Sequence, residues 1–290
     1  AYGSGDLRQS KYDELSLGAE FRLGSESNHR QHRGRASLFW RDGDRQSPEI
    51  TPVVPASSEE TTYLNLHVAW ASTLPLRKTL QINFGADLER EEGENQSRLL
   101  LPPELGGEVA GDYRVDRTTA GVLAELTASA GNWRFEMGTR LDLPSESSSE
   151  WSPRLGVSFR PGGGSVLLRG SIGEAFKLPS FYALASPPAV GGNPELEPET
   201  ALGADLGIDF SPGSTDVKLG LTVFAIEYRN LIDFDFETFR LINRSTVEAR
   251  GLETSLSWQP LAALRVGVEW TLQSVADPVE GEELLQEPAW

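Results

Sequence analysis

The sequence predicts an all-β protein, an antiparallel up-and-down transmembrane β-barrel present in part. About twelve stretches alternate apolar and polar residues with the period of a strand, whose successive side chains project to opposite faces. Every second connection between them is very short, as in a barrel with tight turns on one rim and longer loops on the other. Tryptophans also fall in phase with the apolar face, mostly near strand ends, where the membrane interface favours them; they are Trp40, Trp70, Trp133, Trp258 and Trp270.

In the first half of the chain the alternation is clearest between Thr79 and Glu89, where apolar residues occupy every second position. Two long links separate the expected hairpins, and both contain prolines, which cannot donate to a strand ladder. They are expected at about 47–60, with Pro48, Pro52 and Pro55, and at about 92–114, with Pro102 and Pro103. The strands expected here lie at 14–23, 33–41, 64–70, 79–91, 120–128 and 133–141.

In the second half a third long link is expected at about 177–199, and shorter links near 144–150 and 233–240. The expected strands lie at 155–159, 166–176, 202–210, 217–225, 252–258 and 264–270. The short turns of the whole chain would then gather on one rim, because antiparallel strands alternate in direction. They are expected near 24–29, 75–78, 130–132, 161–164, 211–215 and 259–263.

Composition excludes several classes of function. The chain has 290 residues, a formal net charge of −17, no cysteine and three histidines. Nucleic-acid binding needs clustered lysine and arginine, so no nucleic-acid partner is expected. Without cysteine and with so few histidines, no nucleophilic catalytic arrangement can be assembled, and neither a cofactor nor a metal site is expected. His29 and His32 read as residues of a solvated turn, and Asp233, Asp235 and Glu237 as an exposed hairpin end rather than a cation site.

Three motifs in the second half carry a resemblance to a known family. They are GEAFKLPSFYAL at 173–184, GGNPELEPET at 191–200 and VEARGLE at 247–253. Their order, spacing and intervening strands resemble the barrel signature of TonB-dependent outer-membrane receptors, although Lys177 and Leu178 stand where arginine and alanine are commoner. The prolines suit loop re-entry into a wall, and Gly251 suits a bulge or a close backbone approach. We expect structural roles for Phe176, Pro179, Ser180, Gly192, Asn193, Pro194, Pro198, Glu199, Arg250, Gly251 and Glu253.

The resemblance implies a bacterial outer-membrane transporter that binds a scarce nutrient, such as an iron–siderophore or cobalamin, and imports it with energy delivered through TonB. Such a receptor is a 22-stranded barrel filled by a separate N-terminal plug. We therefore expect residues 1–290 to be a partial barrel domain without the plug, an internal fragment that begins near a strand end at Ala1 and stops as another strand starts at Trp290. The implied partners are outer-membrane lipid, the plug domain of the same parent chain, TonB through the missing N-terminus, and a small-molecule nutrient.

Two sets of side chains are candidate contacts. Aromatic and arginine residues of the long links are candidates for the ligand: Tyr113, Arg114, Phe181, Tyr182, Phe239 and Arg240. Charged residues of the polar face would line the lumen and meet the plug: Arg134, Glu136, Arg140, Arg154, Arg169, Asp205, Asp209, Lys218, Arg265 and Glu269. A passive porin-like channel would have the same lumen chemistry, a soluble β-sandwich binding module would share the alternation, and an outer-membrane enzyme is the weakest alternative.

Overall fold

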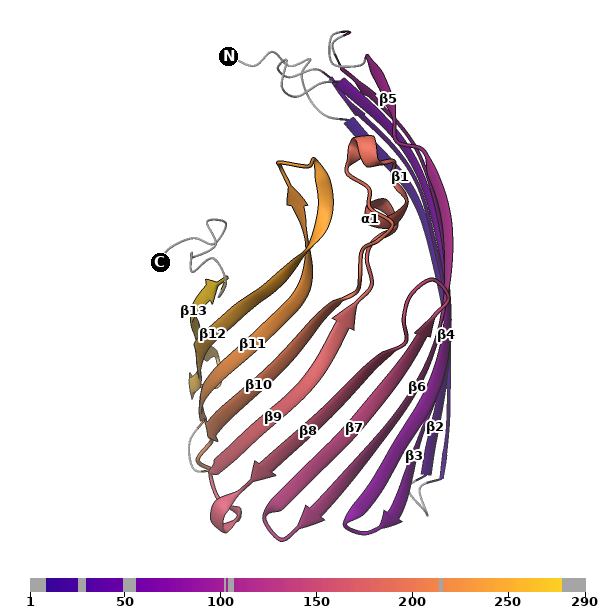
Figure 1. The fold of residues 1–290 in the computed structure, drawn as a ribbon. Coiled ribbons are helices and arrows are strands. Elements are labelled where there is room, and N and C mark those ends of the chain that lie inside the picture. Colours follow the sequence, from indigo (N-terminus) through magenta and orange to yellow (C-terminus); the bar gives the residue numbers. More distant parts are fainter. Residues whose placement is uncertain are drawn as a thin grey trace.

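The computed structural model describes residues 9–25, 30–48, 56–101, 103, 107–213 and 216–277. They form one antiparallel sheet of 13 strands, in which β5 pairs only with β4 and the other twelve follow one another in chain order (Figure 1). No helix among the described residues is long and apolar enough to cross a membrane. The strands are β1 (Gln9–Ser25), β2 (Arg30–Ser47), β3 (Ala56–Arg77), β4 (Leu80–Leu100), β5 (Glu108–Ala110), β6 (Tyr113–Ala130), β7 (Trp133–Pro144), β8 (Glu150–Phe159), β9 (Val166–Lys177), β10 (Glu199–Phe210), β11 (Val217–Asp235), β12 (Arg240–Leu261) and β13 (Leu264–Ala276).

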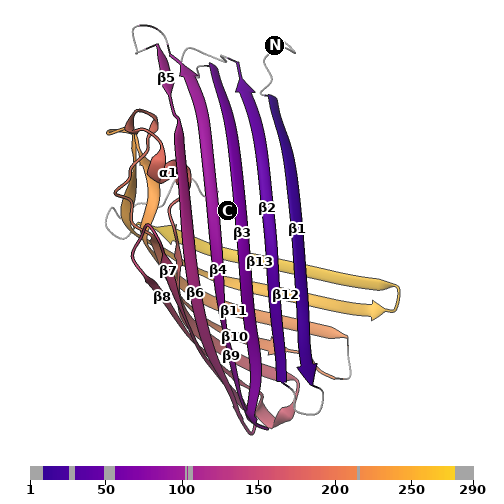
Figure 2. The same ribbon diagram turned by 90° about the vertical axis from the view of Figure 1, so that its right-hand side faces the viewer.

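The sheet is a curved wall that does not close, with β1 and β13 at its two ends. Figure 2 shows β1–β4 side by side, with β9–β13 crossing behind them. The short turns lie on one rim, at the bottom of Figure 1, and the longer connections lie on the other. The prediction of an all-β, up-and-down, partial barrel with about twelve wall strands is therefore confirmed.

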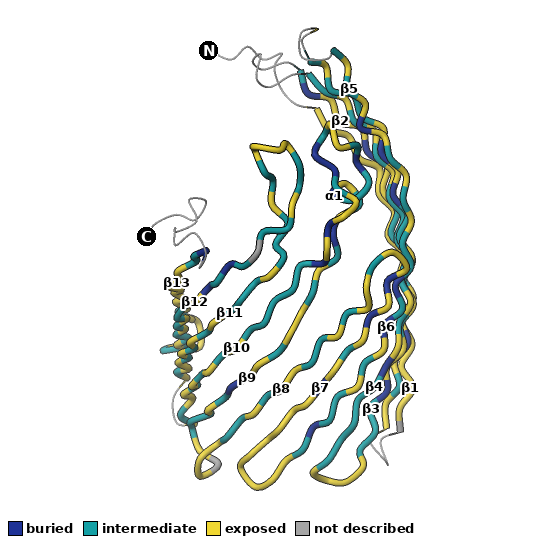
Figure 3. Tube along the Cα trace, in the orientation of Figure 1, coloured by how far each residue is buried: buried dark blue, intermediate teal, exposed yellow. Residues whose placement is uncertain are grey.

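The sheet has one layer and almost no interior, as Figure 3 shows along the trace. Among the described residues the buried hydrophobic side chains are only Ala183, Leu196, Val247 and Ala249, whereas Leu206 is 67% exposed and Val68 is 59% exposed. A soluble sandwich packs two apolar sheet faces against each other. The bare apolar face found here has no second sheet to cover it and needs hydrocarbon instead.

The outward row of β4 marks the height of the hydrocarbon band. From Leu80 to Leu88 every outward residue is apolar, and the eight steps of this run span about 26 Å at ~3.3 Å per residue, close to the height of an outer-membrane band. The next outward residues are Arg90, Glu92 and Glu94, which are charged. Arg90 forms ion pairs with Glu92 at 2.9 Å and with Asp116 at 3.2 Å. About the upper half of β4, from Arg90 to Leu100, therefore projects above the lipid.

Aromatic side chains lie near both limits of this band. Next to a short turn, the ring of Trp133 stacks on that of Phe159 with centroids 4.3 Å apart. At the opposite end of the band, Trp40 is paired with Leu15 and Leu64 just below the outward Asp42. These positions fit the two aromatic girdles of a transmembrane barrel.

Three of the expected link boundaries are wrong. The link expected at 92–114 is mostly strand, because β4 continues to Leu100 and β6 begins at Tyr113. The links expected at 47–60 and 233–240 are shorter as well, since β3 begins at Ala56 and β11 continues to Asp235. Above the lipid both faces of a strand are wet, so the apolar alternation that signals a strand is lost there. Some expectations concern residues outside the described part of the chain. They are the turn residues 26–29 and 214–215, the link prolines Pro52, Pro55 and Pro102, and the strand start at Trp290.

Candidate functional site on the inner face

The strand register places the whole set of predicted lumen residues on the face opposite the apolar rows. Asp205, for example, lies opposite Ser171 and Phe224, while its neighbour Leu206 lies opposite Gly170 and Val223 on the other face. The link between β9 and β10 lies inside the curve of the sheet (Figure 1). Phe181 of this link contacts Arg117, which is on the polar face, so the polar face is the concave one. Contact of Arg134, Glu136, Lys218, Arg265 and Glu269 with a plug stays a prediction.

Arg140 forms an ion-paired brace across three strands of this inner face. From β7 its guanidinium passes over Gly121 of β6 and donates to Asp87 of β4, with Nη1 2.7 Å from Oδ1 and Nη2 3.0 Å from Oδ2. The same guanidinium donates to Asp142, whose side chain is only 4% exposed. A Cβ atom at Gly121 would lie 2.1 Å from Arg140 Nη2, so a larger residue here would displace the guanidinium from its place in the brace.

The same arrangement recurs further along the wall. Arg169 of β9 passes over Gly207 of β10 and donates to Thr222 Oγ1 of β11 at 2.7 Å, and it also binds Asp205 and Asp209. Arg154 of β8 passes over Gly138 of β7 and pairs with Glu125 of β6. These arginines lie along the wall and tie together strands that are not hydrogen-bonded to each other.

A second cluster lies on the inner face just above the outermost apolar residue of β3. Arg117 donates to Glu91 Oε2 from Nε and Nη2, at 2.9 and 2.8 Å, and its Nη1 donates to the carbonyl of Pro179 at 3.1 Å. The guanidinium also lies 4.8 Å from the ring centroid of Phe181. Tyr63 donates its hydroxyl to Glu91 Oε1 at 2.7 Å. Sequence reasoning missed Tyr63 and Arg117, although their positions in phase with the polar face were a weak signal. Glu91 was expected only as part of a solvated rim, whereas it pairs with Arg117 here.

Tyr63 provides a pH-dependent readout of this cluster. Burial, followed by its hydrogen bond to the Glu91 carboxylate, raises the pKa of Tyr63 to about 12 from an ordinary value of 10.0. The neutral phenol is favoured in the folded protein, so its contribution to stability is complete below pH 10 and is lost as the pH rises through 12. The difference in ultraviolet absorbance between wild type and Tyr63→Phe should therefore show a tyrosinate that forms near pH 12. A Tyr63 titration at the ordinary value would contradict this cluster.

The family-motif residues lie mainly at the upper rim. Ser180 caps the short helix α1 (Phe181–Ala185) by accepting from Ala183 N at 3.2 Å. Asn193 donates to the carbonyl of Leu241 at 2.8 Å, and Glu199 accepts from Lys177 Nζ at 2.8 Å. A Cβ at Gly192 would lie 1.7 Å from the carbonyl oxygen of Ser186. Phe176 is the penultimate residue of β9, Pro194 and Pro198 lie in the link before β10, and Arg250 pairs with Glu248 on β12.

Gly251 permits a close approach rather than a bulge. Its register with both neighbouring strands is regular, opposite Phe224 and Gln273. A Cβ there would lie 2.5 Å from Phe224 Cζ and 2.7 Å from the carbonyl oxygen of Leu272. Glu253, two residues on, lies opposite Thr222 on the inner face.

The ligand candidates separate into different positions. The expectation that Tyr113, Arg114 and Arg240 lie in links is wrong, because they are strand residues at the starts of β6 and β12. Tyr113 lies opposite Asn95 on the inner face, whereas Arg114 lies opposite Glu94 on the outer face, 3.9 Å from its carboxylate, and so points away from the lumen. Their contact with a ligand stays a prediction.

The other three candidates are in connections, as expected. Phe181 packs over Gly93, and Tyr182, which is 47% exposed, donates to the carbonyl of Val190 at 2.7 Å. Phe239, which is 67% exposed, lies in the β11–β12 turn with a positive φ of 55°.

The tip of the β11–β12 hairpin presents exposed aromatic rings above the membrane. Phe236 is 78% exposed, and it packs edge-on against Phe234 with ring centroids 5.2 Å apart; Phe239 packs on Phe234 from 6.3 Å. Asp235 holds the turn by accepting from Glu237 N at 3.0 Å and from the Thr238 hydroxyl, and this hydroxyl lowers the pKa of Asp235. The exposed hairpin end expected from the sequence is present, and no group of metal-ligating side chains occurs among the described residues.

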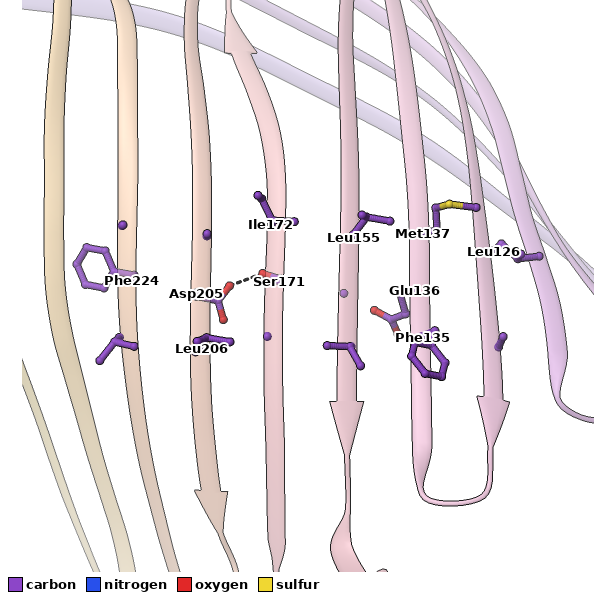
Figure 4. Close-up of a pocket in the computed structure, with 17 residues that line it drawn as sticks. Leu126, Phe135, Glu136, Met137, Leu155, Ser171, Ile172, Asp205, Leu206 and Phe224 are labelled. Carbon is purple, nitrogen blue, oxygen red and sulfur yellow. Dashed lines mark hydrogen bonds between the residues drawn. The ribbon is translucent and has the colours of Figure 1, made fainter.

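A hollow of about 880 Å³ is lined mainly by outward residues of β6–β11, and the inner-face residues Glu136, Ser171, Asp205 and Phe224 also border it. Figure 4 draws its lining residues. Small residues such as Gly170, Ala204 and Ala225 lie there among Met137, Leu155 and other large apolar side chains. The hollow lies within the band that lipid covers, so it belongs to the membrane-facing surface and not to the lumen.

The described residues form a single curved sheet with a bare apolar outer face and a polar inner face. On β4, charged residues begin just above an apolar band about 26 Å high, and this combination defines the wall of an outer-membrane β-barrel. Residues 1–284 match the family model described as "TonB dependent receptor-like, beta-barrel". The chain therefore belongs to the TonB-dependent receptor family, whose barrels lie in the outer membrane of bacteria.

Individual relatives agree with this assignment. A probable TonB-dependent siderophore receptor, PirA of Acinetobacter baumannii, is 29% identical over 143 residues, which are 43% of this chain and 19% of that protein. Among solved structures, the copper transporter OprC superposes with a TM-score of 0.77 at 14% identity, over 95% of this chain and 48% of that one. The siderophore receptor PirA from Acinetobacter baumannii gives 0.68 at 17% identity, over 91% and 44%. The chain thus spans less than half the length of these relatives.

Proposed function

We propose that residues 1–290 are part of the barrel domain of a receptor that binds a scarce solute above the membrane and imports it with energy delivered through TonB. Membership of the TonB-dependent receptor family over residues 1–284 is the observation that carries this proposal. Most of the similar proteins are siderophore receptors, another is a copper transporter and one is a peptide transporter, so a metal chelate is the favoured solute class. A plug domain and a TonB-contacting segment belong to the proposed complete receptor.

The ion pairs of the inner face favour a rigid barrel wall around the lumen contents, with no moving part in the wall itself. Arg140 and Arg169 are tied along the wall by Asp87, Asp142, Asp205 and Asp209, so the charge of these two arginines is not free to trap an anion. Solute capture is accordingly placed at the upper rim, where exposed rings occur outside the hydrocarbon band. The aromatic tip of Phe234, Phe236 and Phe239 is the proposed first contact.

The function is tested by uptake into cells that carry the complete receptor. The test panel is radiolabelled copper and radiolabelled iron as ferric enterobactin or ferric yersiniabactin. It follows three structurally similar proteins: the copper transporter OprC, the ferric enterobactin receptor PfeA and the ferric yersiniabactin uptake receptor FyuA. At least one is expected to accumulate in cells with TonB and not in cells without it. Equal accumulation in both strains would instead indicate a passive channel.

Substitution of the aromatic tip should weaken capture. Because an aromatic contact contributes about 0.5–1.5 kcal/mol, Phe236→Ala or Phe239→Ala should raise the apparent Kd roughly three- to tenfold for the solute that shows TonB-dependent uptake. Binding to whole cells measures this directly. Leu261→Ala is the matched control, since Leu261 is 66% exposed but lies on the opposite rim. Unchanged binding in both phenylalanine variants would remove the tip from the site.

A further inference from the structure

The link between β9 and β10, residues 178–198, is here named the strap. The strands beneath it are short: β7, β8, β9 and β10 have 12, 10, 12 and 12 residues. The strands on either side are longer, with 21 and 18 residues in β4 and β6 and 19 and 22 in β11 and β12. Figure 1 shows α1 of the strap above the short strands, between β6 and the β11–β12 hairpin. The strap therefore occupies the place that taller strands would otherwise fill.

One end of the strap is anchored to the inner face of β3, β4 and β6. Arg117 donates to the carbonyl of Pro179 at 3.1 Å and stacks on Phe181 at 4.8 Å. Phe181 packs over Gly93, where a Cβ would lie 2.6 Å from its Cδ2 atom, and its ring centroid is 6.5 Å from that of Tyr63. The Arg117 side chain is only 11% exposed, so this is a shielded anchor.

The other end is anchored to β12 and β11. Leu241 N donates to the carbonyl of Gly191 at 2.9 Å, and the Asn193 side chain donates to the carbonyl of Leu241 at 2.8 Å. Asn243 accepts from Glu197 N at 2.9 Å and donates to the carbonyls of Glu197 at 3.0 Å and Asn230 at 2.7 Å. The Leu241–Gly191 bond joins two backbone groups, and in the others an asparagine side chain bonds to backbone groups.

Between its two anchors the strap is packed. Two of the four buried hydrophobic residues in the described part of the chain, Ala183 at 3% and Leu196 at 8% exposure, belong to it. The backbone amide of Asn193 donates to the carbonyl of Ala183 at 2.7 Å, which joins its two halves. Segments that open readily have few buried contacts and exposed backbone hydrogen bonds. The strap has the opposite character.

We propose that the strap is a fixed cross-brace. It completes the wall above β7–β9, ties β3–β6 to β11–β12, and stays docked throughout the transport cycle instead of opening as a gate. The part that concerns transport rests on the proposed function, whereas the docking itself does not. In this proposal the family motif at 173–184 anchors one end of the strap, and the motif at 191–200 anchors the other.

The first test tethers the strap in the complete receptor. Residues 1–290 contain no cysteine, and the double variant Gly93→Cys/Phe181→Cys adds two thiols where the Phe181 ring packs over Gly93, so that a Cβ at Gly93 would lie 2.6 Å from Phe181 Cδ2. Oxidation should form the disulfide in outer membranes, visible as a shift in gel mobility, and uptake should stay within about twofold of the reduced protein. A disulfide that does not form would overturn the docking. Uptake that is lost on oxidation and restored by reductant would show that the strap must move.

The second test needs no transported solute, so it distinguishes a failed brace from a failed function. In wild-type receptor the amides of Leu184, Ser186 and Asn193, all bonded within the strap, should exchange with deuterium as slowly as those of the upper β11 strand. Arg117→Met should speed their exchange at least tenfold. Arg134→Met, which removes an exposed inner-face arginine remote from the strap, should leave it unchanged. Fast exchange in the wild type would overturn the proposal.

Discussion

Leu206→Lys is expected to lower the free energy of unfolding of the complete receptor by roughly 2–4 kcal/mol, the cost of a lysine at the middle of a hydrocarbon band. Leu206 is 67% exposed and is the central member of the outward row of β10. On a soluble surface such a residue would accept a charge at almost no cost. The large effect follows only if lipid covers this face.

Ser171→Lys is the matched control, because Ser171 lies at nearly the same depth but on the inner face. It is directly opposite Asp205, so the new ammonium group gains a carboxylate partner in the lumen. We expect its free energy of unfolding to stay within about 1 kcal/mol of wild type. Urea unfolding in lipid vesicles, followed by tryptophan fluorescence, measures both variants. An equal loss on the two faces would be incompatible with a membrane wall.

The membrane-embedded part of this fold could be predicted from the sequence because a single cause acts on every strand there. Hydrocarbon on one side and water on the other select alternate residues, as in β10, where Leu206 and Ile208 alternate with Asp205 and Asp209. Above the band that cause disappears. Arg90, Glu92 and Glu94 all face outward into water on β4, and a pattern search therefore ends the strand too early.

The site could be predicted only in part, because its contacts join residues distant in the chain. Arg117 binds the carbonyl of Pro179, 62 positions away, and no local pattern reports this pair. The motif residue Asn193 was recognised by resemblance, but its partner Leu241, 48 positions away, is found only once the strap is folded. Predicting the arginine braces would require the register of three strands, because that register aligns Arg140, Gly121 and Asp87.

Arg140→Met is expected to destabilise the complete receptor by roughly 2–3 kcal/mol, since loss of one partner leaves buried carboxylates uncompensated. Asp142 and Asp87 are 4% and 13% exposed, and both depend on this guanidinium. The expected loss is smaller than the ~3–5 kcal/mol of a fully buried pair, because the Arg140 side chain itself is 34% exposed and is partly screened by water. Methionine keeps the length of the side chain, so the change reports mainly on charge and hydrogen bonds.

The same substitution at Arg134 provides the comparison within one strand. Arg134 also lies on β7 and on the inner face, but it pairs with Glu136 where the two side chains are 56% and 47% exposed. Such an exposed pair contributes at most about 1 kcal/mol, so Arg134→Met should be nearly neutral. Gly121→Val should reproduce the Arg140→Met defect without removing any charge, because its side chain would occupy the position of the guanidinium. If Arg140→Met and Arg134→Met cost the same in urea unfolding, the inner-face braces do not stabilise the wall, and the glycines beneath them need another explanation.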